Sequence, residues 1–245
     1  MKTIMPIFLL LLLSSLTISS ELNLARLIRG VETQHMAQTS RARSKMIIRR
    51  DGWSRELKMS MTGEGRDRFL AIIESPPRDK GVSSLKIGDE MWNYMPAIDR
   101  VMKIPSSLMG DAWMGSHFTN DDLVKGNKIE ELCTLSVMEE SATSAIVDAI
   151  PRPEAPIVWG RIRYFLDLTR EVATQVIYFD EEETPVREMV FDQFELFENR
   201  HIPMQMKMAP LDAEGESTEV IYESLIFNEP VDSSLFSVRS LRRRR

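Results

Sequence analysis

The sequence is poor in the residues from which metal, redox and disulfide sites are built. Its 245 residues include one cysteine, Cys133, and three histidines. A lone cysteine excludes an intramolecular disulfide, a CxxC redox pair and every cysteine-rich zinc site. The histidines His35, His117 and His201 have no second His or Cys three or four positions away, so no local metal motif is present. We therefore expect no metal ion and no cofactor.

Motifs of nucleotide binding and of common catalysis are also absent. The chain has neither a GxGxxG nor a P-loop pattern, and Gly115-Ser116-His117 lacks the second glycine of a nucleophile elbow. Asp121-Asp122 is typical of a helix cap, and Glu181-Glu182-Glu183 of a solvated turn. We therefore expect no catalytic residue, and we expect that the protein is not an enzyme. An enzyme is the third and least favoured class, because nothing in the sequence selects a nucleophile or a pair of carboxylates.

One apolar run raises the question of a membrane, and it lies at the N-terminus. Residues 4–13 follow Lys2 and precede small polar residues that reach Ser19 and Ser20. As a helix this run spans about 15 Å, which suits the h-region of a signal peptide better than a permanent span. We predict a signal peptide over residues 1–20, with an uncleaved anchor as the alternative. No cysteine lies near the cleavage region, so a lipidated N-terminus is not expected.

Charge is divided unevenly along the chain. Residues 21–110 carry 16 Lys and Arg against 11 Asp and Glu, whereas residues 111–245 carry 14 against 26. Two explanations stay open: a basic binding face, or one sheet whose early and late strands lie against each other. The second is the simpler one. No segment interleaves several basic residues with aromatic ones, so we expect no nucleic-acid partner.

The apolar pattern predicts one helix followed by many strands. Residues 21–38 place apolar side chains at helical spacing, and from residue 44 onward the period is that of strands. Asp51-Gly52 separates two strand-like runs, 44–50 and 54–61, as a tight hairpin turn does. Residues 105–125 break the pattern. We predict about ten or eleven strands in a single domain, 21–245, arranged as one large, curved antiparallel sheet with covering helices.

Methionine is abundant, with sixteen residues, and recurs at strand spacing. Residues two positions apart in a strand share a face, and the flexible thioether side chain adapts to irregular partners. Two interpretations stay open: an ordinary core, or a hydrophobic cavity with the 105–125 segment as its lid. In the second, the candidate ligand-binding residues are Met59, Met61, Trp92, Tyr94, Trp113, Met114, Met204, Met206 and Met208.

Two motifs resemble those of the outer membrane lipoprotein-sorting proteins, the LolA-like family. The first is the strand end Trp92-Asn93-Tyr94-Met95-Pro96, and the second is the segment from Gly115-Ser116 to Asp122-Leu123. With the predicted signal peptide, the early Asp51-Gly52 hairpin and the ending at Leu235-Phe236-Ser237, the resemblance covers nearly all of the mature chain.

The resemblance implies a mainly β (α+β) fold: an unclosed β-barrel, strongly curved around a hydrophobic cavity and capped by helices. It implies a periplasmic carrier that binds acyl chains of lipids or lipoproteins, works as a monomer and delivers cargo toward an outer-membrane acceptor. A lipid-sensing accessory module for an inner-membrane transporter, of the RND or ABC type, is the alternative. The chain departs from the best-known carriers in its longer 105–125 segment and its Met-rich apolar positions, and these departures leave the cargo open.

Overall fold

Thirteen antiparallel strands form one sheet in the computed structural model, which describes residues 23–126 and 128–242. The predicted signal peptide lies outside the described residues. The strands are β1 (Thr39–Arg50), β2 (Trp53–Glu64), β3 (Arg68–Ser75), β4 (Ser83–Ile87), β5 (Glu90–Met95), β6 (Arg100–Lys103), β7 (Cys133–Glu140), β8 (Ser144–Pro151), β9 (Arg161–Asp167), β10 (Val172–Phe179), β11 (Pro185–Phe197), β12 (Arg200–Pro210) and β13 (Ser217–Phe227). The α-helices found in the described ranges are α1 (Leu24–Glu32), α2 (Asn120–Lys125), α3 (Ile129–Leu132) and α4 (Val238–Leu241).

The mainly β, unclosed architecture is confirmed, but the sheet has more strands than the expected ten or eleven. β4, β5 and β6 are five, six and four residues long. The outer strands are β6 and β7, and within the described residues no pairing joins them.

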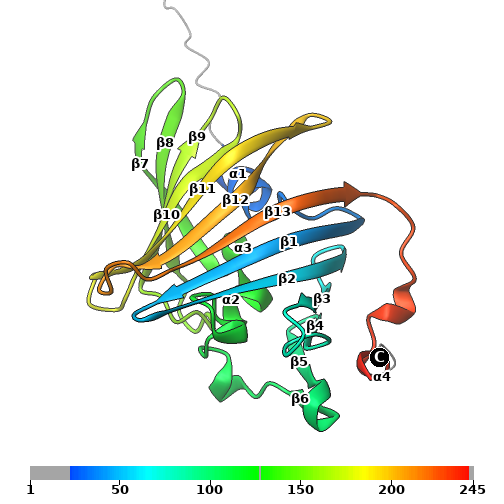
Figure 1. The fold of residues 1–245 in the computed structure, drawn as a ribbon. Helices are drawn as coiled ribbons and strands as arrows, with labels where there is room; N and C mark the ends of the chain where they lie inside the picture. The colour runs from blue at the N-terminus through cyan, green and yellow to red at the C-terminus, as the bar shows by residue number, and fades with distance from the viewer. Residues whose placement is uncertain (1–22, 127, 243–245) are drawn as a thin grey trace, which may run out of the picture.

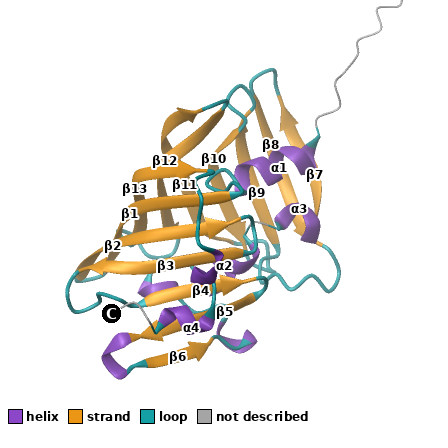
Figure 2. Ribbon diagram, turned by 90° about the vertical axis from the view of Figure 1, so that its right-hand side faces the viewer, coloured by secondary structure: helices purple, strands orange, loops and turns teal. Residues whose placement is uncertain are grey.

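The strand order shows why the sheet curves around a single interior. β1 to β6 and β7 to β13 are two meanders, and β1 pairs with β13 to join them. The chain between β6 and β7 therefore runs from one outer strand to the other, and it carries α2 and α3. Figures 1 and 2 show α1, α2 and α3 inside the curve of the sheet. The concave face is thus covered by short helices rather than by a second sheet.

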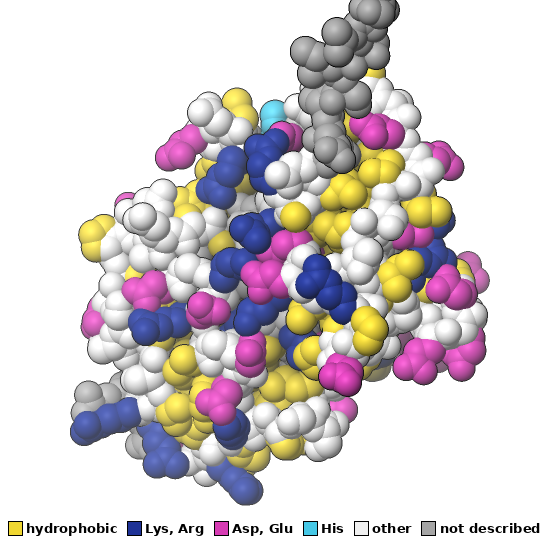
Figure 3. All heavy atoms as spheres, turned by 180° about the vertical axis from the view of Figure 1, so that it is seen from behind, with side chains coloured by type: hydrophobic (Ala, Val, Ile, Leu, Met, Phe, Trp, Pro, Cys, Tyr) yellow, Lys and Arg dark blue, Asp and Glu magenta, His cyan; other side chains and the backbone are white. Residues whose placement is uncertain are grey.

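Pairing of the two meanders explains the uneven charge. Arg49 of β1 forms an ion pair of 3.1 Å with Glu219 of β13, and Arg50 forms one of 3.0 Å with Glu216. Basic residues of the first half thus meet acidic residues of the second, as the single-sheet explanation requires. On the face drawn in Figure 3, basic and acidic side chains are interleaved across the middle.

The β1–β2 hairpin turns where the sequence predicts. Gly52 adopts φ +74°, a conformation that costs glycine little, and both strands extend beyond the predicted runs to Thr39 and Glu64. Along β1, Met46 and Ile48 are fully buried on the concave side. The pleat therefore places the alternate apolar residues of this hairpin toward the helices, which is the arrangement that a curved sheet with one covered face needs.

Candidate functional site

A cavity of about 290 Å³ lies between the concave face of the sheet, the end of α1 and the segment from Trp113 to Gly126. Its volume is close to the lower end of the range of small-molecule sites, about 300–1,000 Å³. Most of its wall is apolar and comes from strands of both meanders, from the loop before β9 and from the covering segment. The apolar wall includes Met59, Met61, Phe69, Trp113, Phe118, Leu123, Ile157, Ile162, Val176, Met189, Phe191, Met206, Met208, Val220 and Leu225.

Register explains how residues far apart in sequence meet in this wall. Met206 of β12 lies directly opposite Phe191 of β11 and Val220 of β13, and residues paired across an antiparallel ladder point to the same face. Met206 also packs against both large apolar clusters of the concave side. It therefore stands at the centre of the cavity floor.

Five of the nine residues singled out from the sequence line this cavity: Met59, Met61, Trp113, Met206 and Met208. Two others lie beside it without lining it. Met114 packs on the edge of the apolar cluster that contains Trp113, and Met204 packs with Ala42, Ile202 and Leu225 at the end of β12.

Trp92 and Tyr94 do not reach the cavity. Trp92 pairs with Leu85, which pairs with Leu70, and these residues pack with Tyr94 against the C-terminal Phe236 and Leu241. They lie on the opposite face of the sheet from Met59 and Met61. The period of two shows that Trp92 and Tyr94 share a face, but which face looks inward depends on the distant C-terminal segment that covers them.

The 105–125 segment is fixed to the concave face by specific hydrogen bonds. The Trp113 indole N–H donates to the Ser84 hydroxyl at 2.9 Å, and the His117 backbone N–H donates to the Thr218 hydroxyl at 2.9 Å. At the start of α2 the Thr119 hydroxyl accepts from the Asp122 N–H, and the Asp122 carboxylate accepts from the Thr119 N–H, which is a capping box. The segment is therefore ordered over the cavity.

A buried ion pair connects this segment to the acidic half of the sheet. The Arg187 guanidinium of β11 donates to both Asp122 carboxylate oxygens, at 2.9 and 2.6 Å, and lies 4.1 and 4.2 Å from the ring centres of Trp159 and Tyr178. Burial alone would lower the pKa of Arg187, but the attraction of Asp122 outweighs it and raises that pKa. Nothing in the sequence pattern around Arg187 indicated this contact.

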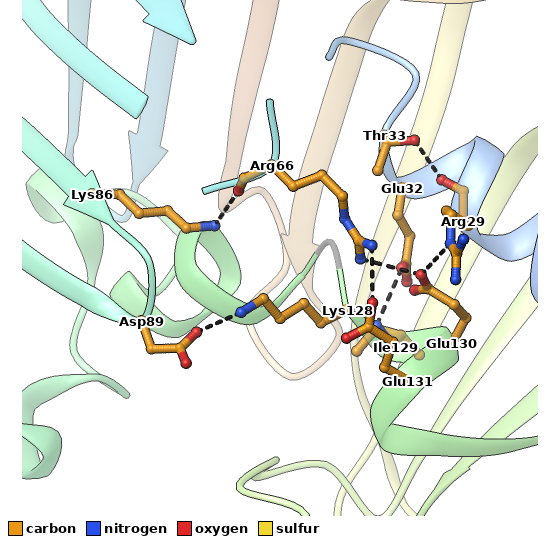
Figure 4. Close-up of polar contacts among 10 residues, drawn as sticks. All are labelled: Arg29, Glu32, Thr33, Arg66, Lys86, Asp89, Lys128, Ile129, Glu130 and Glu131. Carbon is orange, nitrogen blue, oxygen red and sulfur yellow. Dashed lines mark hydrogen bonds and ion pairs between the residues drawn. The ribbon is translucent and has the colours of Figure 1, made fainter. Parts of the chain in front are cut away.

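Polar side chains gather at the end of the cavity near α1, α2 and β4, and sequence analysis identified none of them. Glu32, Lys86 and Tyr164 line the cavity. Burial raises the pKa of Glu32 well above its ordinary 4.5, although the hydrogen bond from the Tyr164 hydroxyl, at 2.7 Å, acts in the opposite direction. Burial lowers the pKa of Lys86 to about 8. Figure 4 shows how Glu32, Lys86 and their charged neighbours lie.

Cys133 and His35 both lie in the packing of the domain. Burial raises the pKa of the Cys133 thiol to about 12, so the thiol is protonated and inert at neutral pH. His35 stacks on Tyr222 with ring centres 4.5 Å apart, and it lies far from any cysteine in sequence. Across residues 23–126 and 128–242 no group of three or more His, Cys, Asp and Glu is placed to hold a metal ion.

The sequence matches a model of a known protein family. A family model described as "Uncharacterized protein" matches residues 65–243, which is more than half of the chain. The chain belongs to this family. No curated protein matches the sequence.

Solved structures of the same shape show that the fold is LolA-like. A structure described as an outer membrane lipoprotein-sorting protein domain, from Vibrio parahaemolyticus, has a TM-score of 0.78 at 19% identity over 89% of this chain and 97% of its own. A DUF1329 family protein from Desulfovibrio piger gives 0.80 at 19% identity, over 89% and 97%. A LolA superfamily protein from Nitrosomonas europaea gives 0.71 at 10% identity, over 88% and 97%.

The LolA-like fold positions the cavity described above. The two meanders curve around it, and the chain between the outer strands covers it. In the part of the chain that the structure describes, no helix is both long and apolar enough to cross a membrane.

Proposed function

We propose that this LolA-like protein is a periplasmic carrier that holds acyl chains of lipids or lipoproteins in the concave cavity and delivers them toward the outer membrane. It forms and breaks no covalent bond. The observation that carries the proposal is the apolar, methionine-lined wall on the concave face, centred on Met206.

The wall is suited to a flexible hydrocarbon chain. Met59, Met61, Met206 and Met208 offer unbranched side chains that adapt to different chain positions. Each methylene transferred from water to such a wall contributes about 0.8 kcal/mol. Ten buried methylenes would thus give on the order of 8 kcal/mol before the costs of association and ordering.

The covering segment gives the cavity a way to admit and release a chain. Residues 105–125 are joined to the sheet through Trp113, His117 and the Asp122–Arg187 ion pair. In the proposal this segment is a lid: it opens for the chain and closes over it. The predicted signal peptide, residues 1–20, delivers the single domain 21–245 to the periplasm, where it works as a monomer.

The neighbours in fold favour the carrier over the transporter-accessory alternative. One of them is described as a lipoprotein-sorting domain and another as a LolA superfamily protein. An accessory module would need a surface for a membrane transporter, and no observation on the described residues selects such a surface.

The test is binding of a fluorescent acyl-chain probe to delipidated protein. The probe should gain fluorescence with the wild type, and Met206→Glu should abolish the gain because it places a charge at the centre of the apolar wall. Met138→Glu is the matched control: Met138 lies on β7 and is 53% exposed, so this variant should bind as the wild type does. Unchanged binding by Met206→Glu would contradict the proposal.

A further inference from the structure

One cation lies in the wall of the cavity without a carboxylate beside it. Lys86, on β4, lines the cavity and is only 2% exposed. Its ammonium donates one hydrogen bond, at 3.0 Å, to the backbone carbonyl of Arg66. Among residues 23–126 and 128–242, no carboxylate oxygen lies within 4.0 Å of the Lys86 Nζ. Two of its three N–H donors therefore remain available for a ligand.

Several charged side chains around Lys86 are already paired with one another. Lys128 contacts Asp89 at 2.6 Å, Lys125 contacts Asp121 at 2.7 Å, and Arg66 contacts Glu130 at 3.1 Å. Figure 4 shows Lys86 directed to the Arg66 carbonyl while Lys128 is directed to Asp89. Asp89, one of the carboxylates that face Lys86, is thus already paired with another cation, while Asp67 faces Lys86 from beyond ion-pair distance.

Glu32, an acid on the cavity wall, forms no ion pair with Lys86 either. Glu32 accepts hydrogen bonds from the Tyr164 hydroxyl at 2.7 Å and from the Ile129 N–H at 3.2 Å. Burial raises the pKa of Glu32 well above 4.5, which favours its uncharged form. Within the described residues the Lys86 ammonium is therefore buried without an ion-pair partner, which costs free energy unless an anion lies beside it.

We propose that the Lys86 ammonium binds the oxyanion head group, carboxylate or phosphate, of an amphiphile whose single acyl chain lies along the methionine-lined wall. This assignment rests on the proposed carrier function and narrows its cargo to anionic amphiphiles. The apolar wall and the ammonium belong to the same cavity, so one molecule contacts both.

The structural alternative is that Lys86 only fastens the β2–β3 turn through the Arg66 carbonyl. The two roles differ in what they require of the side chain. The structural role needs a donor, which Lys86→Gln keeps, whereas head-group binding needs a charge, which both Lys86→Gln and Lys86→Met remove.

The experiment measures competition of four compounds with a neutral fluorescent acyl probe on delipidated full-length protein. Decanoate and decyl phosphate carry both chain and charge, decanol carries the chain alone, and inorganic phosphate carries the charge alone. The wild type should bind decanoate and decyl phosphate at least about tenfold more tightly than decanol, since a charge-assisted hydrogen bond contributes on that scale. Inorganic phosphate should not compete, because it buries no apolar surface.

Both Lys86 variants should bind all three chain compounds with the affinity of decanol. Lys58→Met, an exposed lysine on β2, is the matched control and should keep the preference for anions. In the wild type the preference for decanoate should fall as pH rises from 7 to 9.5, because Lys86, with its pKa of about 8, loses its charge. Lys128, Arg66, Asp67 and Asp89 also face this group, and both variants retain them, so a pH effect that persists in the variants does not come from Lys86.

The outcomes separate the two claims. If no chain compound binds the wild type, the carrier function itself fails. If decanol binds as tightly as decanoate, or if both Lys86 variants keep the preference for anions, the assignment of Lys86 is overturned while the carrier function stands.

Discussion

The Asp122–Arg187 ion pair offers a sharp test of how the covering segment is held. Asp122→Asn keeps the size of the side chain and an oxygen that can accept from the Thr119 N–H, but it removes the negative charge beside Arg187. Arg187 is buried, so the substitution leaves a desolvated guanidinium without its counter-charge. Removing one partner of a buried pair costs about 3–5 kcal/mol.

The lower end of that range applies here, because the Asp122 side chain is 17% exposed and the ring faces of Trp159 and Tyr178 still contact the guanidinium. A loss of about 3 kcal/mol corresponds to roughly a hundredfold change in an equilibrium constant. Since α2 has only six residues, we expect the segment to detach locally before the sheet unfolds.

Amide hydrogen exchange followed by mass spectrometry measures this opening. Peptides covering residues 119–126 should lose protection by about a hundredfold in Asp122→Asn, while peptides from β1 and β2 stay unchanged. If the segment is the lid, the acyl probe should also associate faster. The double variant Asp122→Asn/Arg187→Met should regain much of the protection, since it leaves no unpaired buried charge.

Asp192→Asn, which changes an exposed carboxylate on the strand of Arg187, should leave the exchange of residues 119–126 as it is in the wild type. Either of two results would show that the ion pair does not hold the covering segment on the sheet. One is unchanged protection of residues 119–126 in Asp122→Asn, and the other is an equal loss of protection throughout the sheet.

Two further substitutions test the packing around the cavity. Burial lowers the pKa of His35 from 6.5 to about 4, so the stability that its neutral form contributes is present above pH 6.5 and is lost as pH falls through 4. The variant His35→Phe keeps an aromatic ring against Tyr222 but has no group that titrates. When the pH falls from 7 to 5, the free energy of unfolding measured in urea should therefore decrease by about 2 kcal/mol more in the wild type than in His35→Phe. Equal decreases in the two proteins would contradict this prediction. At Gly160 an added Cβ would lie 2.1 Å from the Asp180 carbonyl oxygen, so Gly160→Ala should lower the free energy of unfolding by about 1–3 kcal/mol. Gly30→Ala is the control, because a Cβ at position 30 has no atom within 4 Å, and its free energy of unfolding should not decrease. Similar decreases in both variants would contradict the steric explanation for Gly160.

Local features of the fold were predictable from the sequence because they depend on neighbouring residues. The Asp51-Gly52 turn fixes the β1–β2 register, and alternation places Met59 and Met61 on one face of β2. The capping pair Thr119 and Asp122 lies within one turn of helix. For the same reason the 105–125 segment stood out as a break in the strand pattern.

Features that depend on contacts distant in sequence were not predictable. Trp92 and Tyr94 face away from the cavity because Phe236 and Leu241, near the C-terminus, cover them. Arg187 meets Asp122 across 65 residues of chain. Lys86 lies between Leu85 and Ile87 in a strand buried on both faces, where alternation carries no information about which side chain lines a cavity.

Native mass spectrometry can show whether the cavity carries an acyl chain. The protein should be purified without detergent from cells that produce it. We predict that the wild type carries a non-covalent adduct with the mass of an acyl-bearing amphiphile and that delipidation removes it. The adduct should be absent from Met206→Glu and present on Met138→Glu. The carrier function would be contradicted if the wild-type protein carries no adduct and also fails to take up an acyl chain after delipidation.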